Sequence, residues 1–293
     1  MPHWYELILI CDPTIARFIA GFRPEAEEAG HNVPMARTSD RVRVILVAVT
    51  AVLQTFAVPL TTWMLGPSSA TSTVSEAYRS PVTPAGFSFY IWGLIYLGCL
   101  AIAAYQLLPG QHARRVHRRT GWWLAGAFLA NAFSVLIFGT RVIWLAQILL
   151  VILVVCLVFA ARGFLVVGPA SSAAEEILLR LPVMIYLGWA TLVTAAGFAT
   201  TFRSWGMPAS ARWVNEIGVV LVLSATIMSL FVLSRLVAVI GFLLTACWAL
   251  LAVALATNSN SVRLASVLAI LIMIAVVIGR ALRSPERRVV LFG

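Results

Sequence analysis

The sequence predicts an all-α integral membrane protein with about eight transmembrane helices. Its 293 residues are 61% hydrophobic and only 11% charged, whereas about a quarter of the residues in a soluble domain are charged. The apolar residues also occur in runs near the roughly 20 residues that a helix needs to cross a bilayer. Backbone polar groups inside lipid must find partners within their own segment, so we expect these runs to be helical.

Eight apolar segments are long enough to span the membrane, and the arginines support this number. All 21 basic residues are arginine. If the segments alternate in direction, sixteen arginines lie on one side and five on the other. Because basic loops are retained in the cytoplasm, both termini are expected there. The predicted spans are 43–65, 86–108, 121–139, 142–165, 177–201, 213–233, 236–256 and 262–280.

The two ends of the chain, outside these spans, are expected to be cytoplasmic. Residues 1–40 are predicted to form an N-terminal cytoplasmic segment, and residues 284–293 a cytoplasmic tail. The sequence leaves open whether residues 1–34 are native, because Met35 could equally be the start of the chain. The bias toward Arg, Ala and Val indicates a GC-rich bacterial genome, so we expect a multi-pass protein of the bacterial inner membrane.

Composition and motif content exclude several classes of function. The net charge of +10 comes from arginines in loops beside apolar runs, where they contact lipid headgroups, so the expected partner is the bilayer and not nucleic acid. No central Asp, Glu, Arg or His occurs in a span, which disfavours ion-coupled transport. We find no metal cluster, no phosphate loop and no Ser/His/Asp arrangement, so an enzyme is not expected. A mechanism based on a tryptophan radical would leave no such signature and stays open.

The stretch from Ser80 to Gly98, SPVTPAGFSFYIWGLIYLG, is unusually rich in aromatic residues. Thr83 and Pro84 are predicted to be the N-cap and first residue of a helix, because both types favour these positions. Phe89, Trp92 and Tyr96 then share one helical face. From spacing alone, packing within the bundle or at the membrane interface is favoured over a ligand pocket.

This stretch resembles the signature of the TspO/translocator protein family, also called tryptophan-rich sensory proteins. Pro84, Phe89, Trp92 and Tyr96 match the family pattern, and Phe87 stands where the family has tryptophan. Two later segments are similar to the third and fifth helices of the family, through Asn131 with Phe138 and through Tyr186 with Trp189. The resemblance covers about residues 43–202 and is closest to the longer bacterial branch of the family.

The resemblance implies a five-helix TspO-like region at 41–203, followed by three additional helices at 204–283. It implies a membrane receptor or carrier for a hydrophobic aromatic or tetrapyrrole (porphyrin)-like ligand, acting in sensing or trafficking, with lipid- or sterol-like ligands as alternatives and no covalent cofactor. An accessory subunit of a larger membrane complex is the other reading, and a homodimer is not excluded. The ligand-binding residues implied are Pro84, Phe87, Phe89, Trp92, Tyr96, Asn131, Phe138, Tyr186 and Trp189.

Overall fold

A computed structural model describes residues 37–208 and 213–293. The expectations for residues 1–36, including the alternative start at Met35, lie outside this described part. Every predicted span is found as a helix, in order, so the fold class is confirmed. The spanning helices are α3 (Thr38–Leu65), α5 (Ile91–Leu107), α6 (Arg115–Gly139), α7 (Ile143–Val167), α9 (Leu181–Ser204), α10 (Trp213–Arg235), α11 (Ile240–Ala256) and α12 (Asn260–Arg283).

Short helical segments complete the chain. Seven of the spanning segments are long and apolar enough to cross a membrane by themselves, and α11 is a shorter apolar helix. A 3₁₀ turn precedes α5, and a π-helical turn precedes α9. The remaining segments are η2 (Pro67–Ser69), α4 (Thr71–Ala77), η3 (Gly86–Tyr90), α8 (Ala173–Glu175), η4 (Glu176–Arg180) and α13 (Arg287–Phe292).

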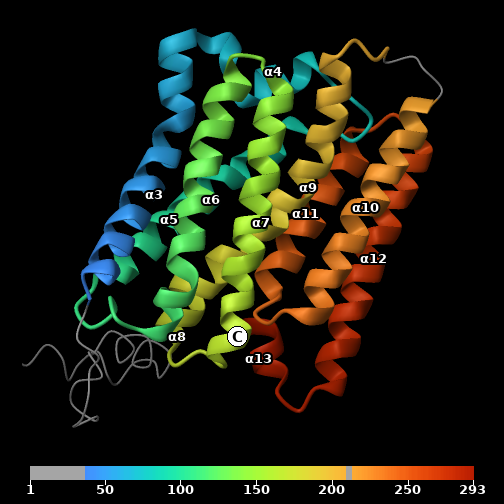
Figure 1. Ribbon diagram of the computed structural model, residues 1–293. Coiled ribbons are helices and arrows are strands. Elements are labelled where there is room, and N and C mark those ends of the chain that lie inside the picture. The colour runs from blue at the N-terminus through green and yellow to red at the C-terminus, as the bar shows by residue number, and fades with distance from the viewer. Residues whose placement is uncertain (1–36, 209–212) are drawn as a thin grey trace, which may run out of the picture.

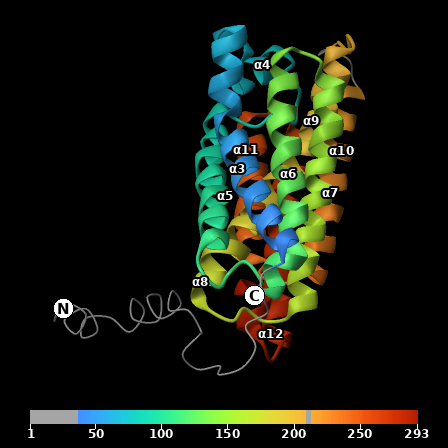
Figure 2. The same ribbon diagram turned by 60° about the vertical axis from the view of Figure 1, so that its left-hand side comes forward.

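The spanning helices form one bundle in which α9 is central. Helix α3 packs on α5 and α6, α6 packs on α7, and α10 and α11 pack on α12 (Figures 1 and 2). Helix α9 contacts α5, α7, α10 and α11. Among the seven long apolar segments, the one that contains α9, Ala173–Ser204, is the most buried. Residues on one side of α9 therefore face the first helices, and residues on the other side face the last three.

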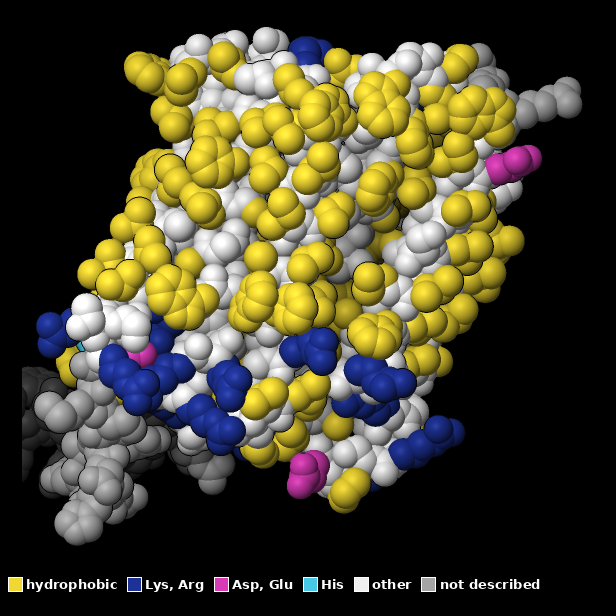
Figure 3. Space-filling model, in the orientation of Figure 1, with side chains coloured by type: hydrophobic (Ala, Val, Ile, Leu, Met, Phe, Trp, Pro, Cys, Tyr) yellow, Lys and Arg dark blue, Asp and Glu magenta, His cyan; other side chains and the backbone are white. Residues whose placement is uncertain are grey.

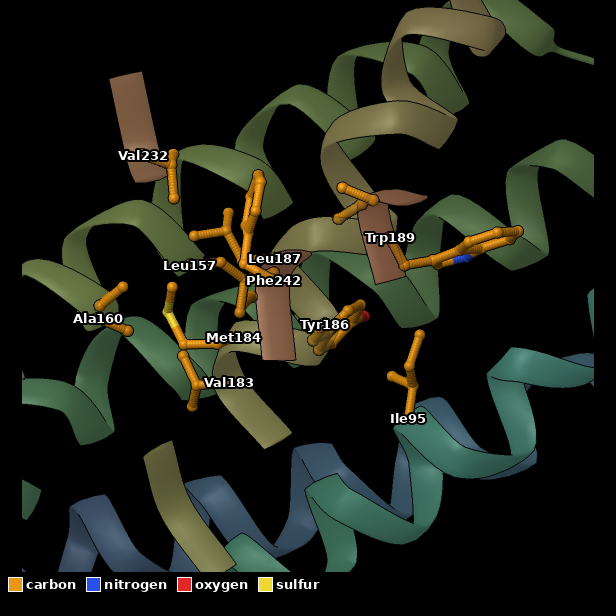
Figure 4. Close-up of a cluster of buried hydrophobic side chains, with 14 of the residues drawn as sticks. Ile95, Leu157, Ala160, Val183, Met184, Tyr186, Leu187, Trp189, Val232 and Phe242 are labelled. Atoms are coloured by element: carbon orange, nitrogen blue, oxygen red, sulfur yellow. The ribbon is translucent and has the colours of Figure 1, made fainter. Parts of the chain in front are cut away.

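Glycines let the neighbours of α9 approach closely. A Cβ atom at Gly188 of α9 would lie 2.6 Å from the Phe242 carbonyl oxygen of α11. A Cβ atom at Gly98 of α5 would lie 2.8 Å from the ring of Pro182. Small residues at such contacts strengthen packing in lipid, where no hydrophobic effect drives helices together. Figure 4 shows part of this core, with Leu187 lying beside Phe242.

Arginines gather at one end of the bundle, below a broad apolar band (Figure 3). Two buried carboxylates organise this end. Asp40 of α3 pairs with Arg43 at 2.7 Å and with Arg118 of α6 at 2.6 Å. Glu175 of α8 pairs with Arg180 at 2.6 Å and with Arg114 at 3.1 Å. Asp40 thus joins α3 to α6, and Glu175 joins the residue before α6 to the turn before α9.

Arg180 links this basic end to the final segment of the chain. Its side chain is fully buried, and it donates hydrogen bonds to the carbonyl oxygens of Gly168 at 2.8 Å and Gly293 at 3.0 Å. The guanidinium also lies over the ring of Phe164 at 5.1 Å. Arg180 thus binds a carbonyl oxygen just after α7 and attaches Gly293, the residue after α13, to the bundle.

The predicted span start at residue 86 is confirmed, but the predicted N-cap at Thr83 and first helical residue at Pro84 are wrong. The first helical turn begins at Gly86, with Ala85 as its N-cap, and the α-helix begins only at Ile91. Thr83 instead closes a turn, because its Oγ1 accepts a hydrogen bond from the Ser80 N–H at 2.9 Å. Residues 80–85 therefore form a non-helical connection that begins with a turn.

This connection is attached to α11. The Ala85 N–H donates to the Ala252 carbonyl oxygen at 3.2 Å. Trp248 of α11 donates its Nε1–H to the Ser88 carbonyl oxygen at 3.4 Å and meets the Phe87 ring edge-on at 5.4 Å. The segment that leads into α5 is thus positioned by a helix more than 150 residues later in the chain.

Candidate functional site

A cavity of about 70 Å³ lies under this connection, toward the end of the bundle that carries α4. It is bounded by the α4 region, the start of α5, and α6, α7 and α9. Its lining is apolar with a few hydroxyl and amide groups, and none of the residues that line it has a titratable side chain. The lining residues are Thr71, Ser75, Thr83, Pro84, Phe89, Trp92, Asn131, Ser134, Val135, Phe138, Ile143, Gln147, Leu150, Val193, Ala196, Gly197 and Thr200.

Trp92 is the centre of an aromatic cluster along one wall of the cavity. Its ring stacks on Tyr96 with centroids 5.4 Å apart, and it meets Tyr186 and Trp189 edge-on at 6.0 and 6.2 Å. Phe89 meets Trp189 edge-on at 6.2 Å. Such contacts add to the burial of each ring. They hold Trp92 and Phe89, two of the three aromatic residues that line the cavity, in fixed orientations.

The aromatic residues of α9 form the layer behind this wall. Tyr186 and Trp189 are almost fully buried. In Figure 4 they lie on the side of the core cluster where Ile95 of α5 lies. Neither lines the cavity, so their contribution to it is to support Trp92 and Phe89 from behind.

A buried glutamine orients Asn131 at the cavity. Gln54 of α3 is fully buried, and its Oε1 accepts hydrogen bonds from Asn131 Nδ2 at 3.2 Å and from the Tyr186 hydroxyl at 3.1 Å. The other side-chain atom of Asn131, the carbonyl oxygen Oδ1, is buried without a hydrogen-bond partner. The amide of Asn131 is therefore held through its nitrogen, and its acceptor is free.

Gln147 of α7 is arranged in the same way. Its Nε2 donates to the Thr194 carbonyl oxygen of α9 at 2.9 Å, while its Oε1 is buried without a partner. Gly197 provides the space for this oxygen, because a Cβ atom there would collide with Oε1. Buried polar atoms nearly always have a partner. Asn131 and Gln147 thus each have a buried carbonyl oxygen without a hydrogen-bond partner, and both residues line the same cavity.

The structure brings five of the nine predicted site residues to the cavity lining: Pro84, Phe89, Trp92, Asn131 and Phe138. Tyr96, Tyr186 and Trp189 lie in the layer behind the wall. Phe87 is not part of the cavity, because its ring is 41% exposed and packs on Trp248. Phe87, which stands where the family has tryptophan, therefore contacts α11.

Sequence reasoning did not assign several lining residues to the site. Gln147 could have been found, because it is an isolated polar residue within an apolar span. Ser134, Thr71, Ser75 and Thr200 carry no such signal, since hydroxyl residues commonly bond to their own helix backbone. Within the described residues, no group of His, Cys, Asp or Glu side chains could hold a metal ion.

The fold defines a polytopic α-helical membrane protein with a cavity, partly lined by aromatic residues, under a helix connection. A family model described as TSPO-like protein matches residues 44–280, and the chain belongs to this family. The match reaches into α12, well beyond the residues 43–202 on which the resemblance was seen. Membership indicates a membrane protein of the receptor or sensor type. No curated protein and no solved structure matches the chain.

Proposed function

We propose that this protein binds a hydrophobic aromatic ligand of the tetrapyrrole kind in the cavity lined by Trp92 and Asn131, for sensing or trafficking. The observation that carries the proposal is the combination of fixed aromatic rings with two unpaired buried acceptors, Asn131 Oδ1 and Gln147 Oε1. A flat ring gains a large apolar contact with Trp92 and Phe89. A few placed polar groups in an apolar pocket fix the orientation of such a ligand.

The unpaired acceptors favour ligands with N–H or O–H groups. A donor at the edge of the ligand, such as the pyrrole N–H of an open-chain tetrapyrrole or the O–H of a protonated porphyrin propionic acid, can donate to a side-chain carbonyl oxygen. It would satisfy an atom that is otherwise buried without a partner. An analogue that lacks the donor would leave that atom unpaired, and a buried unsatisfied group costs about 1–3 kcal/mol. The site should therefore distinguish a ligand with a donor at its edge from an analogue in which that donor is methylated.

The size of the cavity requires movement for a complete macrocycle. Its volume of about 70 Å³ corresponds to roughly five water-sized groups. A tetrapyrrole is several times larger, so its binding requires the connection at residues 80–85 to move outward. Loop opening of this kind commonly admits ligands to enclosed sites.

Titration with protoporphyrin tests the proposal, with quenching of tryptophan fluorescence as the readout. Trp92→Leu and Asn131→Ala are each expected to weaken binding about tenfold, from loss of ring contact and of an acceptor. Trp123→Leu is the matched control, because Trp123 is exposed on the outer face of α6 and stacks on Phe159. Unchanged affinity in both site variants, or an equal loss in the control, would contradict the proposal.

We further propose that the basic end of the bundle lies in the cytoplasm of a bacterial inner membrane, which puts the cavity near the opposite surface. The gathering of arginines at one end supports this orientation. Alkaline phosphatase fused after residue 208 is expected to be active, because that loop would be periplasmic. The same enzyme fused after residue 293 is expected to be inactive, and the reverse pattern would contradict the orientation.

A further inference from the structure

A second, smaller cavity of about 20 Å³ lies on the other side of α9. It is enclosed by α9, α10 and α11, with the connection before α5 above it. All of its lining side chains are apolar, in contrast to the cavity at Asn131. The lining residues are Val82, Pro84, Leu192, Val193, Ala195, Ala196, Leu221, Val222, Ala225, Ala249, Leu250 and Val253.

The two cavities share part of their walls. Pro84, Val193 and Ala196 line both of them. Val193 and Ala196 are three residues apart on α9 and so lie on one face, one turn apart. The partition between the cavities is therefore formed by a proline ring, a valine and a methyl group, all of them small and apolar.

The helices α10 and α11 complete the smaller cavity and also support its roof. Helix α11 holds the connection through the bond from the Ala85 N–H to the Ala252 carbonyl oxygen. The roof that covers the cavity at Asn131 is thus the same segment that covers the apolar cavity, and Pro84 lies at the junction of the two. Displacement of this roof by a ligand would open both cavities together.

We propose that the apolar cavity is a subsite for a short apolar substituent of the ligand, and that α10 and α11 select this substituent. The ligand is then an aromatic molecule with a hydrogen-bond donor near Asn131 and Gln147 and an alkyl or vinyl arm that reaches past Pro84. This inference rests on the proposed function, since it extends the same site. The volume of about 20 Å³ has room for one or two carbon-sized groups, so a two-carbon arm fits.

The test uses three small probes: indole, 3-ethylindole and 1-methyl-3-ethylindole. Binding to the protein in nanodiscs is measured by equilibrium dialysis, and uptake by empty nanodiscs is subtracted. In the wild type, 3-ethylindole is expected to bind about tenfold more tightly than indole, because each buried methylene contributes about fourfold. The 1-methyl compound is expected to lose affinity, because it has no N–H.

Variants of residues that line only the apolar cavity identify where the ethyl group lies. Ala225→Val and Ala249→Val fill the cavity from α10 and from α11, and either one should remove the advantage of 3-ethylindole while leaving indole binding unchanged. Leu250→Ala enlarges the cavity, and it should increase the preference for a longer arm, measured with 3-butylindole. A purely structural role predicts no such gain. Thermal unfolding of each variant confirms that it is folded.

The outcomes separate this inference from the proposed function. If neither the indoles nor protoporphyrin bind, the proposed function fails. If indole and protoporphyrin bind but the ethyl group brings no advantage in the wild type, the subsite inference alone is overturned. It is also overturned if the advantage survives in both filled variants. Loss of the advantage in the filled variants, together with the gain in Leu250→Ala, supports the subsite.

Discussion

Asn131 of α6 donates its side-chain N–H to Oε1 of Gln54 on α3 at 3.2 Å, and the same oxygen accepts the hydroxyl of Tyr186 on α9 at 3.1 Å. One buried amide oxygen thereby connects three helices. In lipid, such bonds between helices are worth about 0.6 to 1.7 kcal/mol each. The network also determines which atom of Asn131 stays free for a ligand.

The first prediction concerns this network. Gln54→Met removes the shared acceptor with little change in volume, and leaves Asn131 Nδ2 and the Tyr186 hydroxyl unpaired. We expect the variant to be less stable by about 1–3 kcal/mol, measured by thermal unfolding in detergent. Tyr186→Phe removes only one of the two bonds and should have the smaller effect. Equal stability of Gln54→Met and the wild type would contradict a structural role for the network.

The second prediction concerns the contact of α9 with α11. A side chain at Gly188 would meet the Phe242 carbonyl oxygen and Thr245 of the neighbouring helix. Gly188→Ala therefore forces the helices apart, and we expect a loss of about 1–3 kcal/mol. Gly93→Ala is the matched control, because nothing lies within 4 Å of its Cβ position. That control should be neutral or slightly stabilising, since alanine favours a helix over glycine. The measurement is the unfolding temperature of each variant, and equal values for Gly188→Ala and Gly93→Ala would contradict the prediction.

The helices could be predicted from the sequence, because the length of an apolar run is imposed by the bilayer and does not depend on neighbouring helices. The residue that caps the second span could not be predicted. Thr83 and Pro84 have the residue types of a helix start, but the bond from Ala85 to Ala252 holds the chain extended there. The local preference of threonine and proline for a helix start is outweighed here by a contact with α11, which lies far away in the sequence.

The cavity was predictable only in part, for a related reason. Spacing places Phe89, Trp92 and Tyr96 on one face of a helix, but it does not show the direction in which that face points. The structure turns Trp92 and Phe89 toward the cavity and Tyr96 into the layer behind them. Gln147 and Asn131 lie on different helices, α7 and α6. Both line the same cavity only because each helix is rotated about its axis so that these side chains face it, and the sequence does not give that rotation.

The third prediction concerns the buried ion pair at the basic end. Glu175 and Arg180 are both almost fully buried, so Glu175→Gln leaves a guanidinium without its charge partner. Removing one partner of a buried pair typically costs about 3–5 kcal/mol. The control is Glu76→Gln, because the pair of Glu76 with Arg79 has side chains about half exposed. An exposed pair contributes about 0–1 kcal/mol. Comparable losses in the two variants, measured by thermal unfolding, would contradict this assignment.

The same variant should also loosen the segment after α12. Arg180 donates to the Gly293 carbonyl oxygen and is itself held by Glu175. Without that carboxylate, α13 loses part of its attachment to the bundle. Limited proteolysis is therefore expected to cleave residues 284–293 faster in Glu175→Gln than in the wild type or in Glu76→Gln. An unchanged cleavage rate would show that the attachment of α13 does not depend on this pair.

The last prediction tests the second free acceptor at the cavity. A methyl group at Gly197 would occupy the position of Gln147 Oε1, so Gly197→Ala must turn the glutamine away or move it. We expect the affinity for protoporphyrin to fall about tenfold, the loss associated with one hydrogen bond in a buried site. Gly126→Ala is the control, because a Cβ atom there makes only ordinary contact with Cys156 at 3.4 Å. Gln147→Leu should show the same loss as Gly197→Ala, and the double variant should show little more. Additive losses would mean that Gly197 affects binding by a route other than Gln147, because independent sites add and coupled ones do not.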